Sequence, residues 1–379
     1  MKKNLFLIFI SIFVTLFLIY ILIFIKISFE NDPRPEYYFK SHKSLNFHKK
    51  YSKILNHLRN SDQDWDIDGN EKNFLYSIVN DFDKTNKDIL LQGDSWIEQI
   101  NLERESLKNI IDYSKKYNFK IINGGITSFS PTLMKLQFEI LKKDFNIHPD
   151  IIVAYIDQTD IGDEICRYKD KRYFNSENKL IGVKSEKFSR SIFDYSRIYR
   201  WSEINLNTKN NLIKTLFYTN FFFEFKIKRA VVKINNILSS GIKNWEEKRC
   251  YFDEIQKYLK EEIKKSDKQY FQNRLKDYLN SILNDTKIEK IFIVTFPHRN
   301  NFFDIKHKDF YKVNVADLVD EELDKFNNPK INHINFYKLL RNNPKFNFEI
   351  YREGDPASHL NGAPHNEIFI NEILKNITK

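Results

Sequence analysis

Five short apolar runs constrain the fold of this chain more than any other feature. Each run stops at a polar turn, and the runs occupy residues 89–92, 119–122, 151–156, 291–296 and 331–336. Apolar residues recur at helical spacing between them, which predicts helices at residues 96–117, from 131 onward, 245–283, 313–326 and 364–377. The alternation predicts an α/β three-layer sandwich with a central parallel sheet.

The first run ends in Gly93-Asp94-Ser95, directly before a helical pattern. Glycine permits a sharp turn there. Ser95 would then lie at a helix N-terminus, where free N–H groups and the helix dipole favour an oxyanion. Ser95 is therefore a candidate nucleophile and Asp94 a candidate substrate contact. The alternative is that either residue only caps the helix.

A second polar motif, Asp355-Pro356-Ala357-Ser358-His359, precedes the last predicted helix. Asp355 stands four residues before His359, so its carboxylate could accept the imidazole Nδ1–H while Nε2 serves as a general base. A solvated loop, in which His359 caps a neighbouring element, is the alternative interpretation.

Together the two motifs resemble the SGNH (GDSL) hydrolase family, whose first motif carries the nucleophilic serine and whose last carries an aspartate and a histidine. The resemblance covers residues 85–166 and 285–379 and implies the flavodoxin-like SGNH hydrolase fold, without a metal or cofactor. It implies a triad of Ser95, His359 and Asp355. It also implies an oxyanion hole built from the N–H groups of Ser95 and Gly125, although the double glycine also fits an ordinary turn.

The third run departs from the family. Where its members carry Gly-x-Asn-Asp, with the asparagine donating to the oxyanion, this chain has Asp157-Gln158-Thr159-Asp160. Thr159 takes the asparagine position, and its hydroxyl or the Gln158 amide could donate instead. The departure bears on catalysis rather than fold. The alternative function is a non-catalytic SGNH-fold protein for glycan binding or assembly.

Two further features belong to the expected active-site edge. His298 and Arg299 follow the fourth run, where they could contact substrate or lie in a solvated loop. Residues 167–244 are rich in aromatic side chains and do not alternate, which predicts an inserted helical and aromatic cap above the strand ends. Those aromatic residues could equally form the cap's own core.

The N-terminal segment predicts membrane attachment. Residues 5–25 are 21 consecutive uncharged residues, long enough to span a bilayer as a helix. Lys2 and Lys3 favour a cytoplasmic N-terminus, which would place the catalytic domain outside the cytoplasm, in the periplasm of a Gram-negative cell. We expect an anchor at 1–26, a linker or strap at 27–84, and the hydrolase domain at 85–379. A buried core helix is the alternative.

Charge and cysteine content limit the classes of binding partner that the sequence supports. The net charge is +10, but the basic residues are scattered, which argues against nucleic-acid binding. Cys166 and Cys250 have neither metal-ligand nor redox-motif spacing. A single disulfide between them is one alternative, and two free thiols are the other. The sequence thus predicts a serine-dependent acyl-ester hydrolase or O-acyltransferase. The resemblance favours O-acetyl groups on envelope polysaccharide, with an acylated glycan or small ester as substrate. It does not indicate an oligomeric state.

Overall fold

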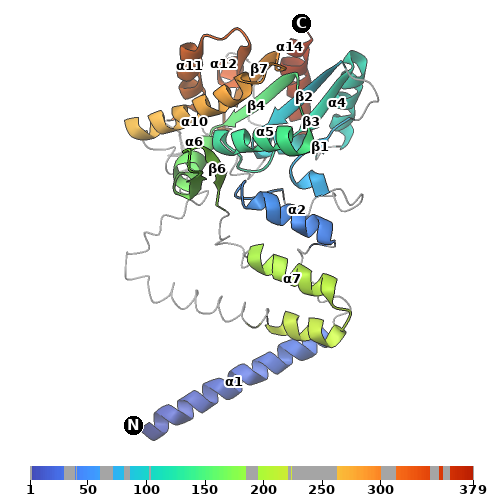
Figure 1. Ribbon diagram of the computed structural model, residues 1–379, viewed down its shortest axis with the longest axis vertical. Helices are drawn as coiled ribbons and strands as arrows, with labels where there is room; N and C mark the ends of the chain where they lie inside the picture. The colour runs from blue at the N-terminus through green and yellow to red at the C-terminus, as the bar shows by residue number, and fades with distance from the viewer. Residues whose placement is uncertain are drawn as a thin grey trace. The chain divides into compact units, whose positions relative to one another are not determined.

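The computed structural model describes residues 2–29, 39, 41–59, 71–80, 86–101, 104–184, 195–220, 223, 263–299, 313–341, 350–352 and 359–378. The chain divides into two compact units (Figure 1). The first comprises Met1–Lys50, Ser61–Glu71 and Glu186–Glu247. The second comprises Tyr51–Asn60, Lys72–Ser185 and Lys248–Lys379, and it holds the sheet.

The second unit is built on a six-stranded sheet with the order β1-β3-β2-β4-β7-β8. Its strands are β1 (Ser77–Ile78), β2 (Lys87–Gln92), β3 (Phe119–Asn123), β4 (Ile151–Asp157), β7 (Lys290–Phe296) and β8 (Ile331–Asn335). Every pairing is parallel except that of β1 with β3. The five parallel strands, numbered along the chain, have the flavodoxin-like order 2-1-3-4-5.

The five predicted strands and the α/β class with a mostly parallel sheet are confirmed. The antiparallel strand β1 is an addition to the predicted parallel sheet, and it lies in the segment interpreted as a linker or strap. With only two residues, β1 is too short to leave a periodic signal in the sequence.

Helices cover both faces of the sheet (Figure 1). Successive strand side chains point to opposite faces. On β2, Ile89 and Leu91 share a buried cluster with Ile110 of α4 (Arg104–Tyr117) and with residues of the C-terminal helices. Gln92 faces the other way. Its amide donates to Met134 O at 2.9 Å in α5 (Pro131–Phe145) and accepts from Tyr278 at 2.9 Å in α10 (Lys265–Leu283).

Three predicted helices differ in detail. The helix expected over residues 96–117 is divided into α3 (Ser95–Glu98), a 3-10 turn (Gln99–Asn101) and α4. Trp96, Ile97, Gln99 and Ile100 are all buried, which one straight amphipathic helix on a sheet cannot achieve. Residues 245–262 of the long predicted helix lie outside the described residues. The closing helix contains a π turn (Phe369–Leu374) between α13 (Gly362–Ile368) and α14 (Lys375–Ile377). α11 (Val315–Phe326) matches its prediction within two residues.

The first unit is helical. It contains α1 (Lys2–Phe29), most of α2 (His42–Ser52), α7 (Tyr195–Asn207) and a helical segment at residues 211–220. His48 Nδ1 lies 2.8 Å from Tyr199 Oη, which ties α2 to α7. Side chains of α1 are described for residues 10–26. Within the described part of the chain, no helix combines the length and apolarity needed to cross a membrane.

The predicted cap is described only in part. Its described pieces are the hairpin of β5 (Arg172–Phe174) and β6 (Leu180–Val183) in the second unit, and α7 with residues 211–220 in the first. Cys166 is half-buried, and Cys250 lies outside the described residues. The domain boundaries and the role of the cap stay predictions.

Candidate active site

The turn after β2 requires glycine. Gly93 has φ +146°, and a Cβ on it would lie 2.8 Å from the Cβ of Tyr155 on the adjacent strand β4. Glycine therefore allows β2 to lie close to β4 and the chain to turn directly into α3. Asp94 is the N-cap of this helix: its Oδ1 accepts from the Trp96 N–H at 2.9 Å. Because Asp94 is a buried cap, it is not placed as the substrate contact predicted from the sequence.

Ser95 and His359 meet at this turn. His359 Nε2 lies 2.6 Å from Ser95 Oγ, although 264 positions separate the two residues along the chain. The Trp96 ring packs beside the imidazole, with centroids 5.7 Å apart. The backbone of His359 is held as well, because its carbonyl accepts from the Arg352 N–H at 2.8 Å. Asp355, the predicted partner of the imidazole, lies outside the described residues.

This pair lies where such a fold forms ligand sites. Ser95 follows the C-terminal end of β2, and β2 lies between β3 and β4, where the strand order reverses. Open parallel sheets bind ligands beyond the strand C-termini at this switch point. A hydroxyl bonded to an imidazole nitrogen at a helix N-terminus has the arrangement of an activated nucleophile.

The loop after β3 corrects the prediction for Gly125. Its N–H donates to Asn123 Oδ1 at 2.8 Å, so it is not directed at an oxyanion. A Cβ on Gly125 would lie 2.0 Å from Ile97 Cγ2, which shows that glycine is needed for close packing on α3. Sequence reasoning missed Ser128, which has φ +62°. In the described structure the N–H groups of residues 124–127 and 129 have protein acceptors, whereas that of Ser128 has none.

Arg59, from the segment predicted to be a strap, binds backbone carbonyls of the loop after β3. Its Nε donates to Gly125 O and its Nη2 to Asn123 O, both at 2.8 Å. Burial lowers the pKa of Arg59, and the Glu98 carboxylate, 3.9 Å from Nε, opposes that shift. His57 Nε2 also lies 2.6 Å from Thr127 O. The strap is therefore part of the site's framework.

The end of β4 corrects two more predictions. The Thr159 hydroxyl donates to Asp157 Oδ2 at 2.5 Å, and His298 Nε2 lies 2.7 Å from Asp157 Oδ1. Both side chains are buried and engaged with the same carboxylate, so neither is placed as the predicted oxyanion donor or substrate contact. Burial alone would raise the pKa of Asp157, but His298 and Thr159 together lower it.

Gln158 is likewise structural. Its Nε2 donates to Val313 O, and its Oε1 accepts from Val315 N at 3.1 Å, so the amide joins the end of β4 to the start of α11. This pairing removes Gln158 from the predicted donors and substrate contacts. Arg299 follows His298 and is half-buried, and its predicted role stays untested.

Buried acids surround the nucleophile turn. Burial raises the pKa of Asp94 well above its usual range, and the nearby Asp157 carboxylate raises it further. The pKa of Asp160 is raised for the same reason, with Asp94 adding to the effect. Among the described residues, no group of three histidine, cysteine or acidic side chains could hold a metal.

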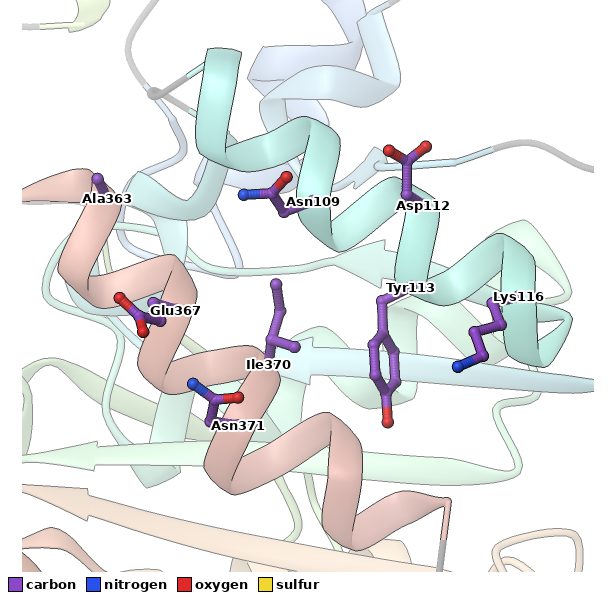
Figure 2. Close-up of a pocket in the computed structure, with 8 residues that line it drawn as sticks. All are labelled: Asn109, Asp112, Tyr113, Lys116, Ala363, Glu367, Ile370 and Asn371. Atoms are coloured by element: carbon purple, nitrogen blue, oxygen red, sulfur yellow. The ribbon is translucent and has the colours of Figure 1, made fainter.

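A hollow of about 630 Å³ lies elsewhere, between α4 and the C-terminal helices (Figure 2). Figure 2 shows Tyr113 and Ile370 directed into the space between these helices. The hollow is lined by Asn109, Asp112, Tyr113, Lys116, Ala363, Glu367, Ile370 and Asn371. Neither Ser95 nor His359 lines it, so the site is assigned from the Ser95–His359 contact instead.

No protein-family profile and no curated protein matches the sequence. A GDSL-like lipase from Bacteroides thetaiotaomicron is similar in structure at 10% identity, covering 77% of this chain and 87% of its own, with a TM-score of 0.36. A mutant acetyl-xylooligosaccharide esterase from Geobacillus stearmophilus is similar at 9% identity, covering 78% and 95%, with a TM-score of 0.37. The chain resembles the SGNH hydrolases in its motif order and strand order.

Proposed function

We propose that this protein is a serine-dependent acyl-ester hydrolase or O-acyltransferase. The observation that carries the proposal is the 2.6 Å contact between His359 Nε2 and Ser95 Oγ. His359 takes the hydroxyl proton as Ser95 Oγ attacks the ester carbonyl carbon, and it returns that proton to the departing alkoxide. Water or a sugar hydroxyl then attacks the acyl–Ser95 ester, loses its proton to His359 and releases Ser95.

Asp355 is the proposed partner of the His359 Nδ1–H. The proposal rests on sequence, because Asp355 lies outside the described residues. Its spacing to His359 is one residue longer than the Asp-x-x-His of the family motif. The carboxylate would hold the tautomer in which Nε2 accepts the serine proton.

We assign the oxyanion to the N–H groups of Ser95 and Ser128. The Ser95 N–H lies at the start of α3, and the Ser128 N–H belongs to the loop that packs against that helix. Ser128 has a positive φ, a conformation that costs a non-glycine residue about 1–2 kcal/mol.

Ser128→Gly should therefore keep turnover, because glycine retains the N–H and adopts positive φ readily. Valine also keeps the N–H, but a β-branched residue disfavours positive φ. Ser128→Val should therefore displace the donor and lower kcat by about 10²- to 10³-fold, the usual cost of one lost oxyanion donor. Steady-state kinetics on a p-nitrophenyl acetate substrate, with circular dichroism to confirm folding, distinguish the two. Equal turnover in both variants would place the donor elsewhere.

The favoured substrate is an O-acetylated cell-envelope polysaccharide, with water or a sugar hydroxyl as acceptor. This choice rests on the family resemblance together with the predicted position outside the cytoplasm. The second candidate is a non-catalytic glycan-binding or assembly protein, favoured by the engagement of Thr159 with Asp157 instead of an oxyanion.

A serine-directed fluorophosphonate separates the two functions. The active pair should give one covalent adduct on Ser95 in intact-mass and peptide analysis, and the Ser95→Ala variant should give none. A protein that folds normally and stays unmodified would support the non-catalytic candidate. Product analysis with and without a glycan acceptor then distinguishes transferase from esterase.

We also propose that residues 1–26 anchor the chain by one helix, with the second unit outside the cytoplasm. The support is the run of 21 uncharged residues at positions 5–25 of the sequence. Positions 5–9 of that run lie outside the part of α1 whose side chains are described, and among the described residues no helix meets the length and apolarity that a membrane span needs. Full-length protein should stay in the membrane fraction after washing with 1 M salt or carbonate. An alkaline phosphatase fused after Lys379 should be active. Release by salt, or an inactive fusion beside an active cytoplasmic reporter, would contradict this topology.

A further inference from the structure

Three cationic side chains gather around one tyrosine ring in the second unit. Lys169 Nζ and Arg172 Cζ each lie 4.9 Å from the centre of the Tyr270 ring, and Arg274 Cζ lies 5.4 Å from it. These distances are within the range of cation–π attraction. The ring helps to position the cations, but it does not neutralise their charge. We call Lys169, Arg172 and Arg274 the basic cluster.

The carboxylates near the ring leave two of these cations without an ion pair. The nearby acidic residues are Glu164, Asp170 and Asp277. Asp277 Oδ2 pairs with Arg274 Nη2 at 3.1 Å. Glu164 is buried and accepts hydrogen bonds from the residues that begin α5. In the described structure Lys169 and Arg172 form no ion pair, and Arg172 Nε donates only to the backbone carbonyl of Lys169, at 3.4 Å.

The surroundings of the ring also lack a hydrogen-bond acceptor. Tyr270 Oη and Arg274 Nε are both buried, and neither has a hydrogen-bond partner in the described structure. Both atoms carry a hydrogen that they can donate, and buried donors are normally paired. Two unpaired donors beside two cations without ion pairs indicate a ligand that is anionic and accepts hydrogen bonds.

The basic cluster lies at the same edge of the sheet as the proposed nucleophile. Lys169 and Arg172 belong to the segment that follows the C-terminal end of β4. Tyr270 lies in the first half of α10, and the end of α10 leads to the start of β7, so this first half lies at the C-terminal edge of the strands. Tyr168, directly before Lys169, donates to Ser128 O at 2.5 Å. The basic cluster and the reacting ester are therefore next to the same loop.

We propose that Lys169 and Arg172 bind a carboxylate or phosphate group on the glycan whose acyl ester reacts at Ser95. The inference rests on the proposed function and narrows its substrate to an anionic polysaccharide. A planar guanidinium can bind either group through two hydrogen bonds, and the lysine adds a second positive charge. The position beside the Ser128 loop favours the substrate over a lipid headgroup, which carries the same charge.

The test uses full-length protein and pairs of O-acetylated oligosaccharides that differ only in charge. The first pair is an O-acetylated oligogalacturonide with free carboxylates and the same oligomer with methyl-esterified carboxylates. The second pair is O-acetylated dextran with and without phosphate groups, which distinguishes phosphate from carboxylate. Titration calorimetry on the Ser95→Ala protein gives the Kd of each oligomer without turnover. Acetate release by the wild type gives kcat/KM. We define the charge preference as the ratio of charged to neutral affinity within a pair.

In at least one pair, the charged form should bind about tenfold more tightly, since a hydrogen bond to a charged group usually contributes that much or more. The preference should fall as salt is added, because salt screens the cations. Adding Arg172→Gln should remove most of the preference, whereas Arg172→Lys, which keeps the charge without the planar fork, should remove less. Lys276→Gln removes one charge from the exposed side of α10 outside the basic cluster and should keep the preference.

Equal Kd values within both pairs, or a preference that Arg172→Gln leaves intact, would overturn the inference and leave the proposed function standing. An Arg172-dependent preference in a protein that takes no fluorophosphonate adduct would leave the anion site standing and overturn the proposed function. Arg172-dependent binding to phosphatidylglycerol vesicles, without a preference in either pair, would assign the basic cluster to lipid and overturn the inference.

Discussion

Replacing Ser95 with alanine should lower kcat for ester hydrolysis by about 10⁴- to 10⁶-fold, the range that loss of a nucleophile causes in serine hydrolases. His359→Ala should cost as much, because the two groups act as one unit in each proton transfer. The double variant should be no slower than either single one. Initial rates on p-nitrophenyl acetate over a range of enzyme concentrations measure these losses.

The matched controls are Ser176→Ala, in the exposed hairpin of the second unit, and His148→Ala, before the N-terminal end of β4. Both should keep turnover within about twofold, since surface substitutions away from special features are close to neutral. Thermal unfolding should show that Ser95→Ala and His359→Ala remain folded. Unchanged turnover in a folded Ser95→Ala protein would contradict the proposed nucleophile.

Replacing His298 with alanine should destabilise the second unit by about 1–3 kcal/mol at pH 7, the usual cost of leaving a buried polar group without its hydrogen-bond partner. His298 is fully buried against Asp157, so alanine leaves a cavity and a buried carboxylate without its imidazole partner. His298→Gln, which keeps a donor for Asp157, should lose less. Urea unfolding followed by tryptophan fluorescence measures the difference.

The effect of His298→Ala should depend on pH. Because the folded-state pKa of Asp157 is lowered, the pair contributes stability above the usual carboxyl pKa of about 3.9 and loses it as the pH falls through the folded value. The stability deficit of His298→Ala should therefore be largest near pH 7 and shrink toward pH 3. Equal stability of variant and wild type at pH 7 would contradict the assigned pairing.

Thr159→Val offers a comparison at the same carboxylate. Alignment alone predicts a loss of kcat, whereas the structure indicates a loss of stability, because the hydroxyl donates to Asp157. Hydrogen bonds to charged groups contribute about 1.5–3 kcal/mol, so the unfolding midpoint should fall while the rate changes little.

Local periodicity was sufficient to predict the sheet. A buried parallel strand is a short apolar run, and the helices between such runs repeat their apolar residues every three to four positions. Both signals are contained within a few neighbouring residues. The edge strand β1 and the division between α3 and α4 leave no such signal, because pairing with Asn123 and complete burial of Trp96 depend on distant segments.

The sequence by itself determined which residues supply the chemistry of the turn after β2. Gly93 and Ser95 belong to one three-residue motif, and His359 stands in a second motif, so both motifs could be identified before the fold was known. Only the tertiary structure decided which polar groups are available to a ligand. Protein partners already bond four of the candidate groups, which are the side chains of Thr159, Gln158 and His298 and the N–H of Gly125. The Ser128 N–H has no such partner in the described structure. The reason is that a buried polar group pairs with whatever donor or acceptor the folded chain brings beside it, and those partners come from segments far away in the sequence.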